Sequence, residues 1–286
     1  MTARLAPAPR GLRSLAPLVV LTAAAGYFVL PLWWLFVAST KSRGDLAVTP
    51  GLWFSDFALL DNLKDLFTHE DGVYLRWLVN TALYAGLGAV LATLVSAMAG
   101  YVFAKHPFRG SEATFAVVLA GVLVPPAALA LPLFLLFSSV HLTNTYWAVL
   151  VPSVVSPLGV YLARLQVEAA VPDELIEAAR MDGANEYRIF FAIVLRLIRP
   201  ALVTIFLFQA VAIWNNFFLP LIMLSDSDLY PVTLGLFSWN TQVLGDPDLT
   251  RLVIAGSLVS AVPLALAFVS LERHWRGGPL GGGVKG

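Results

Sequence analysis

Residues 113–163 read ATFAVVLAGVLVPPAALALPLFLLFSSVHLTNTYWAVLVPSVVSPLGVYLA and contain no lysine, arginine, aspartate or glutamate. Because about 20 apolar residues cross the hydrocarbon core of a bilayer, this stretch is long enough for two membrane-spanning helices. The polar segment SSVHLTNT at 138–145 divides it. We therefore expect one span near 113–137 and another near 146–163.

Four further charge-poor runs lie on either side of this stretch, and we expect spans near 15–38, 77–104, 200–224 and 252–271. The composition agrees, because 58% of the residues are hydrophobic and only 13% are charged, about half the charged fraction of soluble domains. The first run is too long for the apolar part of a signal peptide, so we expect it to be retained. The sequence predicts an all-α integral membrane protein with six transmembrane helices.

The basic residues are distributed unequally between the two sides of these spans. With the N-terminus inside, thirteen lysines and arginines fall in inner segments and five in outer ones. Cytoplasmic loops carry the excess of basic residues in membrane proteins. We therefore expect a cytoplasmic N-terminal segment (1–14), a six-span membrane domain (15–271) and a cytoplasmic glycine-rich tail (272–286).

The segment 164–199, between the fourth and fifth spans, holds eleven charged side chains, five basic and six acidic. Pro172 suits the start of a helix, and the acids that follow it lie near the positive helix end. Gly183 is typical of the left-handed residue that stops a helix. Asn185 is a suitable cap for a second helix, on which Ile189, Ile193 and Leu197 share one face. The pattern predicts a cytoplasmic helix–turn–helix.

Two interpretations of this segment remain open from the residues alone. The small side chains of Ala178 and Ala179 would let another surface approach the first helix, and Glu177 and Asp182 would offer it negative charge. Alternatively the segment is a solvated loop, with Glu177 and Arg180 paired at i, i+3.

Several classes of chemistry lack support in the sequence. There is no cysteine, the four histidines are widely separated, and the net charge is zero, which disfavours thiol chemistry, a metal site and nucleic-acid binding. There is no phosphate-binding Gly-x-x-x-x-Gly-Lys-Ser/Thr loop and no hydrolase motif. We expect no enzymatic activity and no cofactor. No ionisable residue is placed at mid-membrane, which disfavours proton coupling, while sodium coupling through backbone carbonyls stays open without a feature in its favour. If the chain moves a solute, we expect the energy to come from a partner.

The residues EAARMDGA at 177–184, followed by Ile193-x-Leu195, resemble the "EAA" loop of permease subunits of binding-protein-dependent ABC importers. The segment WNNFFLP at 214–220 and the terminal GGVKG are similar to the carbohydrate branch, specifically to the maltose-type second permease. The resemblance implies that Glu177, Ala178, Ala179, Asp182 and Gly183 dock a cytoplasmic ATPase. The family usually has proline after Ile-x-Leu, where this chain has Arg196, so we expect its second helix to run unbroken toward Pro200.

The resemblance further implies half of the translocation path for a sugar in the bacterial plasma (inner) membrane. The implied partners are a second permease subunit in a heterodimer, a dimer of ATP-binding subunits, an extracytoplasmic solute-binding protein and membrane lipid. One alternative is a permease for a solute such as a glycerophosphodiester or polyol. Another is a membrane scaffold or assembly factor without transport.

Polar and aromatic residues elsewhere are candidates for the substrate path or for partner contacts. Within the spans these are Asn80, Tyr84, Gln209, Trp214, Asn215 and Asn216. Hydrogen bonding between helices is the alternative for each of them. In the outer loop they are Tyr230, Trp239, Asn240 and Gln242, which by resemblance would contact the solute-binding protein and otherwise form an ordinary interfacial loop. The resemblance also places the tail 277–286 near the ATPase pair.

Overall fold

The computed structural model describes residues 15–275, with side chains from 17 to 270, and this part of the chain is helical with no strand. The predicted all-α fold is confirmed. The described residues divide into two compact units: 15–66 together with 240–258, and 67–239 together with 259–275. The predicted N-terminal segment 1–14 and residues 276–286 of the predicted tail lie outside the described residues.

Four helical stretches are long and apolar enough to cross a membrane: Pro17–Ser39, Leu59–Lys105, Tyr146–Ala170 and Leu249–Ser270. Two further pairs of helices pass the same criterion only together. They are Ser111–Leu123 with Pro126–Ser139, bent by 105°, and Glu186–Leu197 with Arg199–Trp214, bent by 83°. The described chain thus has four candidate spans, or six if each bent pair crosses once.

The first unit contains α1 (Leu15–Ser39), α2 (Arg43–Val48), most of α3 (Leu59–Thr68) and the beginning of α15 (Leu249–Trp275). Polar contacts hold its turns together. Asn62 donates hydrogen bonds to the carbonyls of Ser39 and Lys41, each at 2.9 Å. The Nζ of the buried Lys41 donates to Thr49 Oγ1 at 2.8 Å.

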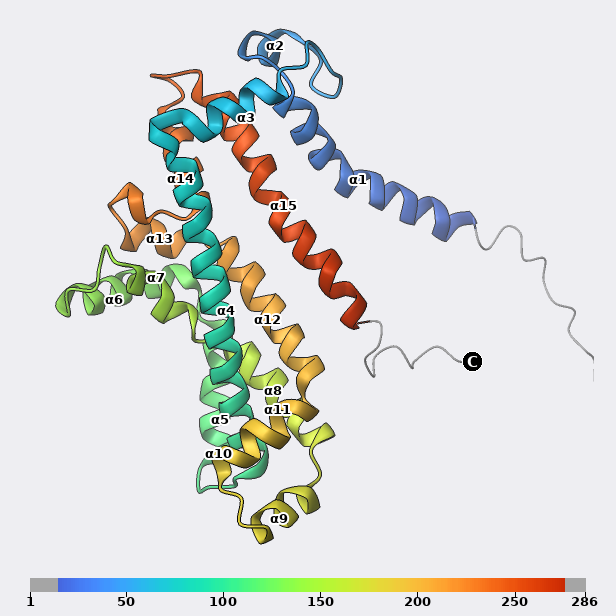
Figure 1. Ribbon diagram of the computed structural model, residues 1–286, viewed down its shortest axis with the longest axis vertical. Coiled ribbons are helices and arrows are strands. Elements are labelled where there is room, and N and C mark those ends of the chain that lie inside the picture. Colours follow the sequence, from blue (N-terminus) through green and yellow to red (C-terminus); the bar gives the residue numbers. More distant parts are fainter. Residues whose placement is uncertain (1–14, 276–286) are drawn as a thin grey trace, which may run out of the picture. The chain divides into compact units, whose positions relative to one another are not determined.

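The second unit is built around α4 (Val73–Lys105), against which α7 (Tyr146–Ser153), α8 (Pro157–Ala170) and α12 (Arg199–Trp214) pack. Figure 1 shows α4 as the long helix of this unit. Small residues line its buried side, among them Ala89, Ala92, Ala97 and Gly100. Small residues allow close helix approach, which favours packing where lipid provides no hydrophobic drive. The α4–α8 contact therefore depends on the absence of bulky side chains.

The stretch predicted as the third span is not one straight helix. It contains α5 (Ser111–Ala120), a short 3-10 turn (Gly121–Leu123) and α6 (Pro126–Ser139). The break coincides with Pro125 and Pro126, where Val124 and Pro125 have extended backbone. Proline lacks an amide hydrogen and disfavours a helical residue before it, which explains the bend.

The other predicted spans also differ in their details. The fourth continues from α7 into α8 and ends at Ala170 instead of residue 163. The fifth divides into α12 and α13 (Phe218–Met223), with a break at residues 215–217. The predicted outer loop contains a 3-10 turn (Ser227–Leu229) and the helix α14 (Val232–Gln242).

Candidate functional site

The first helix of the loop 164–199 is α9 (Asp173–Met181), which begins directly after Pro172. The backbone turns at Gly183, whose φ of +79° lies in the left-handed region. The amide of Ala184 then donates to the carbonyl of Ala179 at 3.0 Å, a bond that closes the end of the helix. The predicted stop at Gly183 is confirmed.

The second helix begins with α10 (Glu186–Ile189), and Asn185 Oδ1 accepts a hydrogen bond from the amide of Arg188 at 2.9 Å. The predicted cap is confirmed. A π-helical turn (Phe190–Val194) and α11 (Leu195–Leu197) continue the helix through Arg196, so it runs unbroken to the bend at Ile198. This agrees with the effect expected of arginine in place of proline.

The predicted apolar face of this second helix is confirmed at Ile189, holds only in part at the half-buried Ile193 and is wrong at Leu197. Ile189 is buried, but Leu197 is 40% exposed. The buried positions are Ile189, Phe190, Val194 and Ile198. A π turn takes up more residues than an α turn, and it therefore shifts which side chains face the core.

Only one side of α9 packs against its own chain. Ile176 is the buried residue of this helix, and it joins a core cluster that includes Tyr101 and Phe190. Glu177 and Ala178 are exposed, whereas Ala179 is half-buried and packs against the same cluster. The exposed face predicted for docking therefore includes Ala178 but not the whole of Ala179.

Charged contacts attach α9 at both of its ends. At the beginning, Lys105 Nζ lies 2.6 Å from Asp173 Oδ1. Near the end, Arg180 Nε donates to Glu186 Oε1 at 2.8 Å, and this bond raises the pKa of the Arg180 guanidinium. Arg180 therefore forms its hydrogen bond with Glu186 and not with Glu177, although the negative charge of Glu177 also raises the pKa of Arg180. Glu177 has no hydrogen bond or ion pair to the described residues.

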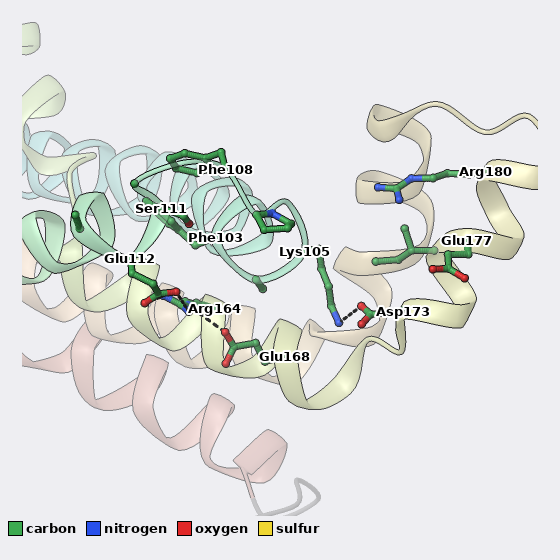
Figure 2. A pocket seen from close by; sticks show the side chains of 15 residues that line it. Phe103, Lys105, Phe108, Ser111, Glu112, Arg164, Glu168, Asp173, Glu177 and Arg180 are labelled. Atoms are coloured by element: carbon green, nitrogen blue, oxygen red, sulfur yellow. Dashed lines mark hydrogen bonds and ion pairs between the residues drawn. The ribbon is translucent and has the colours of Figure 1, made fainter.

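A cavity of about 660 Å³ lies beside α9, bordered by the end of α4, the start of α5 and α8. Figure 2 shows Glu177, Arg180 and Asp173 on one side of it and Glu112, Arg164 and Glu168 on the other. Arg164 is held by Glu112 at 2.6 Å and by Glu168 at 2.8 Å, and it lies over the ring of Phe115. The described residues contain no group of side chains arranged to hold a metal ion.

Two residues predicted for the substrate path have structural partners instead. The amide of Asn80 donates to the carbonyls of Asp228 and Tyr230, and its oxygen accepts from the Tyr146 hydroxyl at 3.1 Å. The hydroxyl of Tyr84 donates to the carbonyl of Leu229 at 2.9 Å. Both side chains are buried. They fix the segment 228–230, and Asn80 also borders a cavity lined by Arg76, Tyr146 and Asp228.

The other four path candidates lie on or just after α12. Gln209 Nε2 donates to Ser156 Oγ, which joins α12 to the start of α8. Asn215 donates to the carbonyl of Val211 at 2.8 Å, and Asn216 Oδ1 accepts from the amide of Leu219 at 3.4 Å. Trp214 packs against the core. These contacts correspond to the alternative role in helix packing and capping, although Asn215 itself is exposed.

The four candidates in the predicted outer loop differ in how much of each side chain is exposed. Trp239 is 1% exposed and packs against Trp77, with ring centroids 4.6 Å apart. This burial contradicts its predicted contact with a solute-binding protein. Tyr230 is half-buried, with its hydroxyl donating to the carbonyl of Ser225 at 3.3 Å. Asn240 and Gln242 are exposed and belong to the first unit.

The Gly183 turn leads to a prediction about stability. A Cβ on Gly183 would meet no atom within 4 Å, so the cost of Gly183→Ala comes from the left-handed backbone alone. We expect the free energy of unfolding to fall by about 1–2 kcal/mol. Gly183→Asn should lose less, because asparagine tolerates this conformation. Thermal unfolding followed by tryptophan fluorescence measures both, and equal stability of the alanine variant and the wild type would contradict the prediction.

Three residues that lie outside the loop 164–199 and contact it were not predicted from the sequence: Tyr101, Lys105 and His106. Tyr101 and Lys105 are four residues apart on the last turns of α4, where such a spacing places side chains on one face. That spacing was a usable signal. Their partners on α9 and α10 are 68 and 85 residues further along the chain, and no local pattern identifies them.

Comparison with known proteins agrees with this architecture. A family model described as "Binding-protein-dependent transport system inner membrane component" matches residues 75–274. The arabinooligosaccharides transport system permease protein AraQ of Halalkalibacterium halodurans is 38% identical over 227 residues, covering 79% of this chain and 80% of the relative. The lactose transport system permease protein LacG of Rhizobium radiobacter is 32% identical over 265 residues, covering 92% and 93%.

The fold also matches a chain of a bacterial ABC transporter involved in the import of the acidic polysaccharide alginate. The TM-score is 0.80 at 20% sequence identity, and the match covers 94% of this chain and 99% of the other. At this level of identity the likeness concerns the fold.

Proposed function

The chain belongs to the family of binding-protein-dependent transport system inner membrane components, and we propose that it is a permease subunit of an ABC importer for a sugar. The match to two relatives named for saccharide transport covers 80% and 93% of their lengths. The helical stretches Leu59–Lys105, Tyr146–Ala170 and Leu249–Ser270 make it a multi-pass membrane protein. In this proposal it forms half of the translocation path, and a second permease subunit forms the other half.

The observation that carries the coupling role is the exposed Glu177 on α9, which makes no hydrogen bond or salt bridge to another described residue. Glu177 and Ala178 face away from the core, while Ile176 anchors the same helix in it. An exposed carboxylate that no described residue engages by a hydrogen bond is available to a cation on another chain, and the small neighbour permits close approach. We propose that this face docks an ATP-binding subunit on the cytoplasmic side of the bacterial plasma membrane.

The distribution of basic residues supports this orientation, because it places both termini and the loop 164–199 on the cytoplasmic side. Since the chain has no ATP-binding loop of the Gly-x-x-x-x-Gly-Lys-Ser/Thr type, we propose that ATP is hydrolysed by the partner subunits. A solute-binding protein outside the membrane would deliver the sugar.

Isolation of the tagged chain from its native membrane tests the assembly. We expect it to co-purify with an ATP-binding subunit and a second permease subunit. In proteoliposomes with ATP inside and the solute-binding protein outside, the complex should accumulate at least one labelled sugar from a panel of oligosaccharides and disaccharides. Recovery of the chain without either partner would instead favour the scaffold alternative. An intact complex that takes up no sugar of the panel would favour a different solute.

A further inference from the structure

The attachment of α9 to the rest of the protein consists of an apolar anchor and two polar contacts. Ile176 is the anchor, buried near the middle of the helix. Lys105 holds the beginning of α9 through Asp173. Arg180, one turn from the end, reaches Glu186 on the next helix. If α9 receives a displacement from a partner, these contacts determine which parts of the protein move with it.

Glu186 joins three helical elements through one carboxylate. Its Oε1 accepts from Arg180 Nε of α9 at 2.8 Å, and its Oε2 accepts from the Tyr101 hydroxyl of α4 at 2.8 Å. His106 Nε2, just after α4, lies 3.2 Å from the same Oε2. The Tyr101 side chain is almost entirely buried, so its hydroxyl depends on this acceptor. Hydrogen bonds to a charged acceptor are stronger than neutral ones.

The pair between Arg180 and Glu186 also crosses the turn at Gly183. Gly183 has no side chain, and no atom lies within 4 Å of where its Cβ would be. The turn therefore resists a change in the angle between α9 and α10 through its backbone bonds, through the apolar cluster that Ile176 and Ile189 share, and through this pair, which is its polar side-chain contact. Without Glu186, Ile176 and the contact at Asp173 would still hold the first half of α9 in place.

We propose that Glu186 is a positioning residue for coupling, which locks α9 across the Gly183 turn and ties it to α4 through Tyr101. A displacement of α9 then moves α4, the central helix of the second unit, instead of being taken up by bending at Gly183. This inference rests on the proposed docking of an ATP-binding subunit to α9. It assigns a role in coupling to a residue outside the EAARMDGA segment.

The first experiment measures sugar uptake and ATP hydrolysis by the complete importer in proteoliposomes. For Glu186→Ala we expect uptake per ATP to fall about three- to tenfold, the range for losing partly screened hydrogen bonds to a charged group. Tyr101→Phe should reduce the ratio less, because the contact with Arg180 remains. Glu186→Gln keeps an acceptor oxygen and should recover part of the ratio lost in Glu186→Ala.

Glu112→Gln is the matched control. It removes an equal charge from an ion pair with Arg164 of similar length, but that pair joins α5 to α8 and does not involve α9. We expect its uptake per ATP to equal that of the wild type. If Glu112→Gln and Glu186→Ala lower the ratio equally, the effect is a general consequence of lost ion pairs, and the proposal is wrong.

The second experiment follows the two helices directly. The chain has no cysteine of its own. A variant with one cysteine at Met98 of α4 and one at Met181 of α9, both exposed positions, therefore carries spin labels at these two sites of the chain. In the assembled wild-type importer, the distance distribution between the labels should be narrow and should keep its width when nucleotide is added. In Glu186→Ala it should broaden, and its mean should shift with nucleotide.

The two hypotheses fail in different ways. If Glu177→Lys leaves assembly with the ATP-binding subunit intact, the proposed docking on α9 is wrong. If Glu177→Lys disrupts assembly but Glu186→Ala changes neither uptake per ATP nor the distance distribution, then docking stands and the role of Glu186 is overturned.

Discussion

Glu177→Lys is expected to abolish ATP-driven uptake while the chain still inserts into the membrane. Glu177 is exposed on α9 and has no partner among the described residues, so its replacement leaves the packing of its own chain intact. At a docked interface the new lysine would face the cation that the carboxylate receives. Such an unpaired interfacial charge costs about 3 kcal/mol or more of binding free energy. This cost corresponds to docking that is about a hundredfold weaker.

Co-purification and uptake measure this effect together. The variant should be present in the membrane at the wild-type level, lose the ATP-binding subunit on purification and transport no labelled sugar. Glu177→Gln should show a smaller loss, since it removes the charge without reversing it. Asp61→Lys, which reverses an exposed charge on α3, is the control and should retain uptake. Normal transport by Glu177→Lys would show that α9 does not couple through this residue.

Gly100→Ala is expected to destabilise the protein strongly, although it adds a single methyl group. A Cβ at this position of α4 would lie 2.6 Å from the Cβ of Ala163 and 2.6 Å from the backbone nitrogen of Arg164 on α8. Backbone atoms move only if the whole helix moves. We expect the free energy of unfolding to fall by about 3 kcal/mol, at the upper end for overpacking in a well-packed core.

Two other glycines of the same helix provide matched controls. A Cβ on Gly86 would meet nothing within 4 Å, so Gly86→Ala should leave stability unchanged or raise it by up to about 1 kcal/mol through helix propensity. A Cβ on Gly88 would meet the end of the Ile213 side chain at 2.9 Å, and a side-chain end yields more readily than backbone, so an intermediate effect is expected. Tryptophan fluorescence during thermal unfolding measures all three. Equal effects at Gly86 and Gly100 would contradict the close packing of α4 and α8.

Local chemistry explains which parts of the candidate site were predictable. Gly183 and Asn185 act through their own backbone conformation and their nearest neighbours, so their roles as stop and cap follow from residue type and position. The effect of Arg196 is of the same kind, because proline or its absence acts on a single turn. The exposed position of Glu177 also follows from the pattern of its own helix.

Contacts between distant parts of the chain explain the errors. The sequence around Trp239 resembles an exposed aromatic loop, yet the side chain packs against Trp77 in a core formed by α4 and α14. Asn80 and Tyr84 have the polarity of a solute path, but their partners are loop carbonyls that the chain reaches about 150 residues later. The apolar period of the second loop helix failed because a π turn changed its register.

The amino-acid sequence by itself determined that the protein is helical and spans the membrane, where its apolar stretches lie, and where the loop helices start and stop. These properties depend on hydrophobicity, backbone preference and capping, which act over a few residues. Only the tertiary structure decided which polar side chains are buried and which remain free. It brings Tyr101 and Glu186 together across 85 residues and leaves Glu177 without a hydrogen bond or salt bridge among the described residues, because side-chain contacts are set by the packing of whole helices.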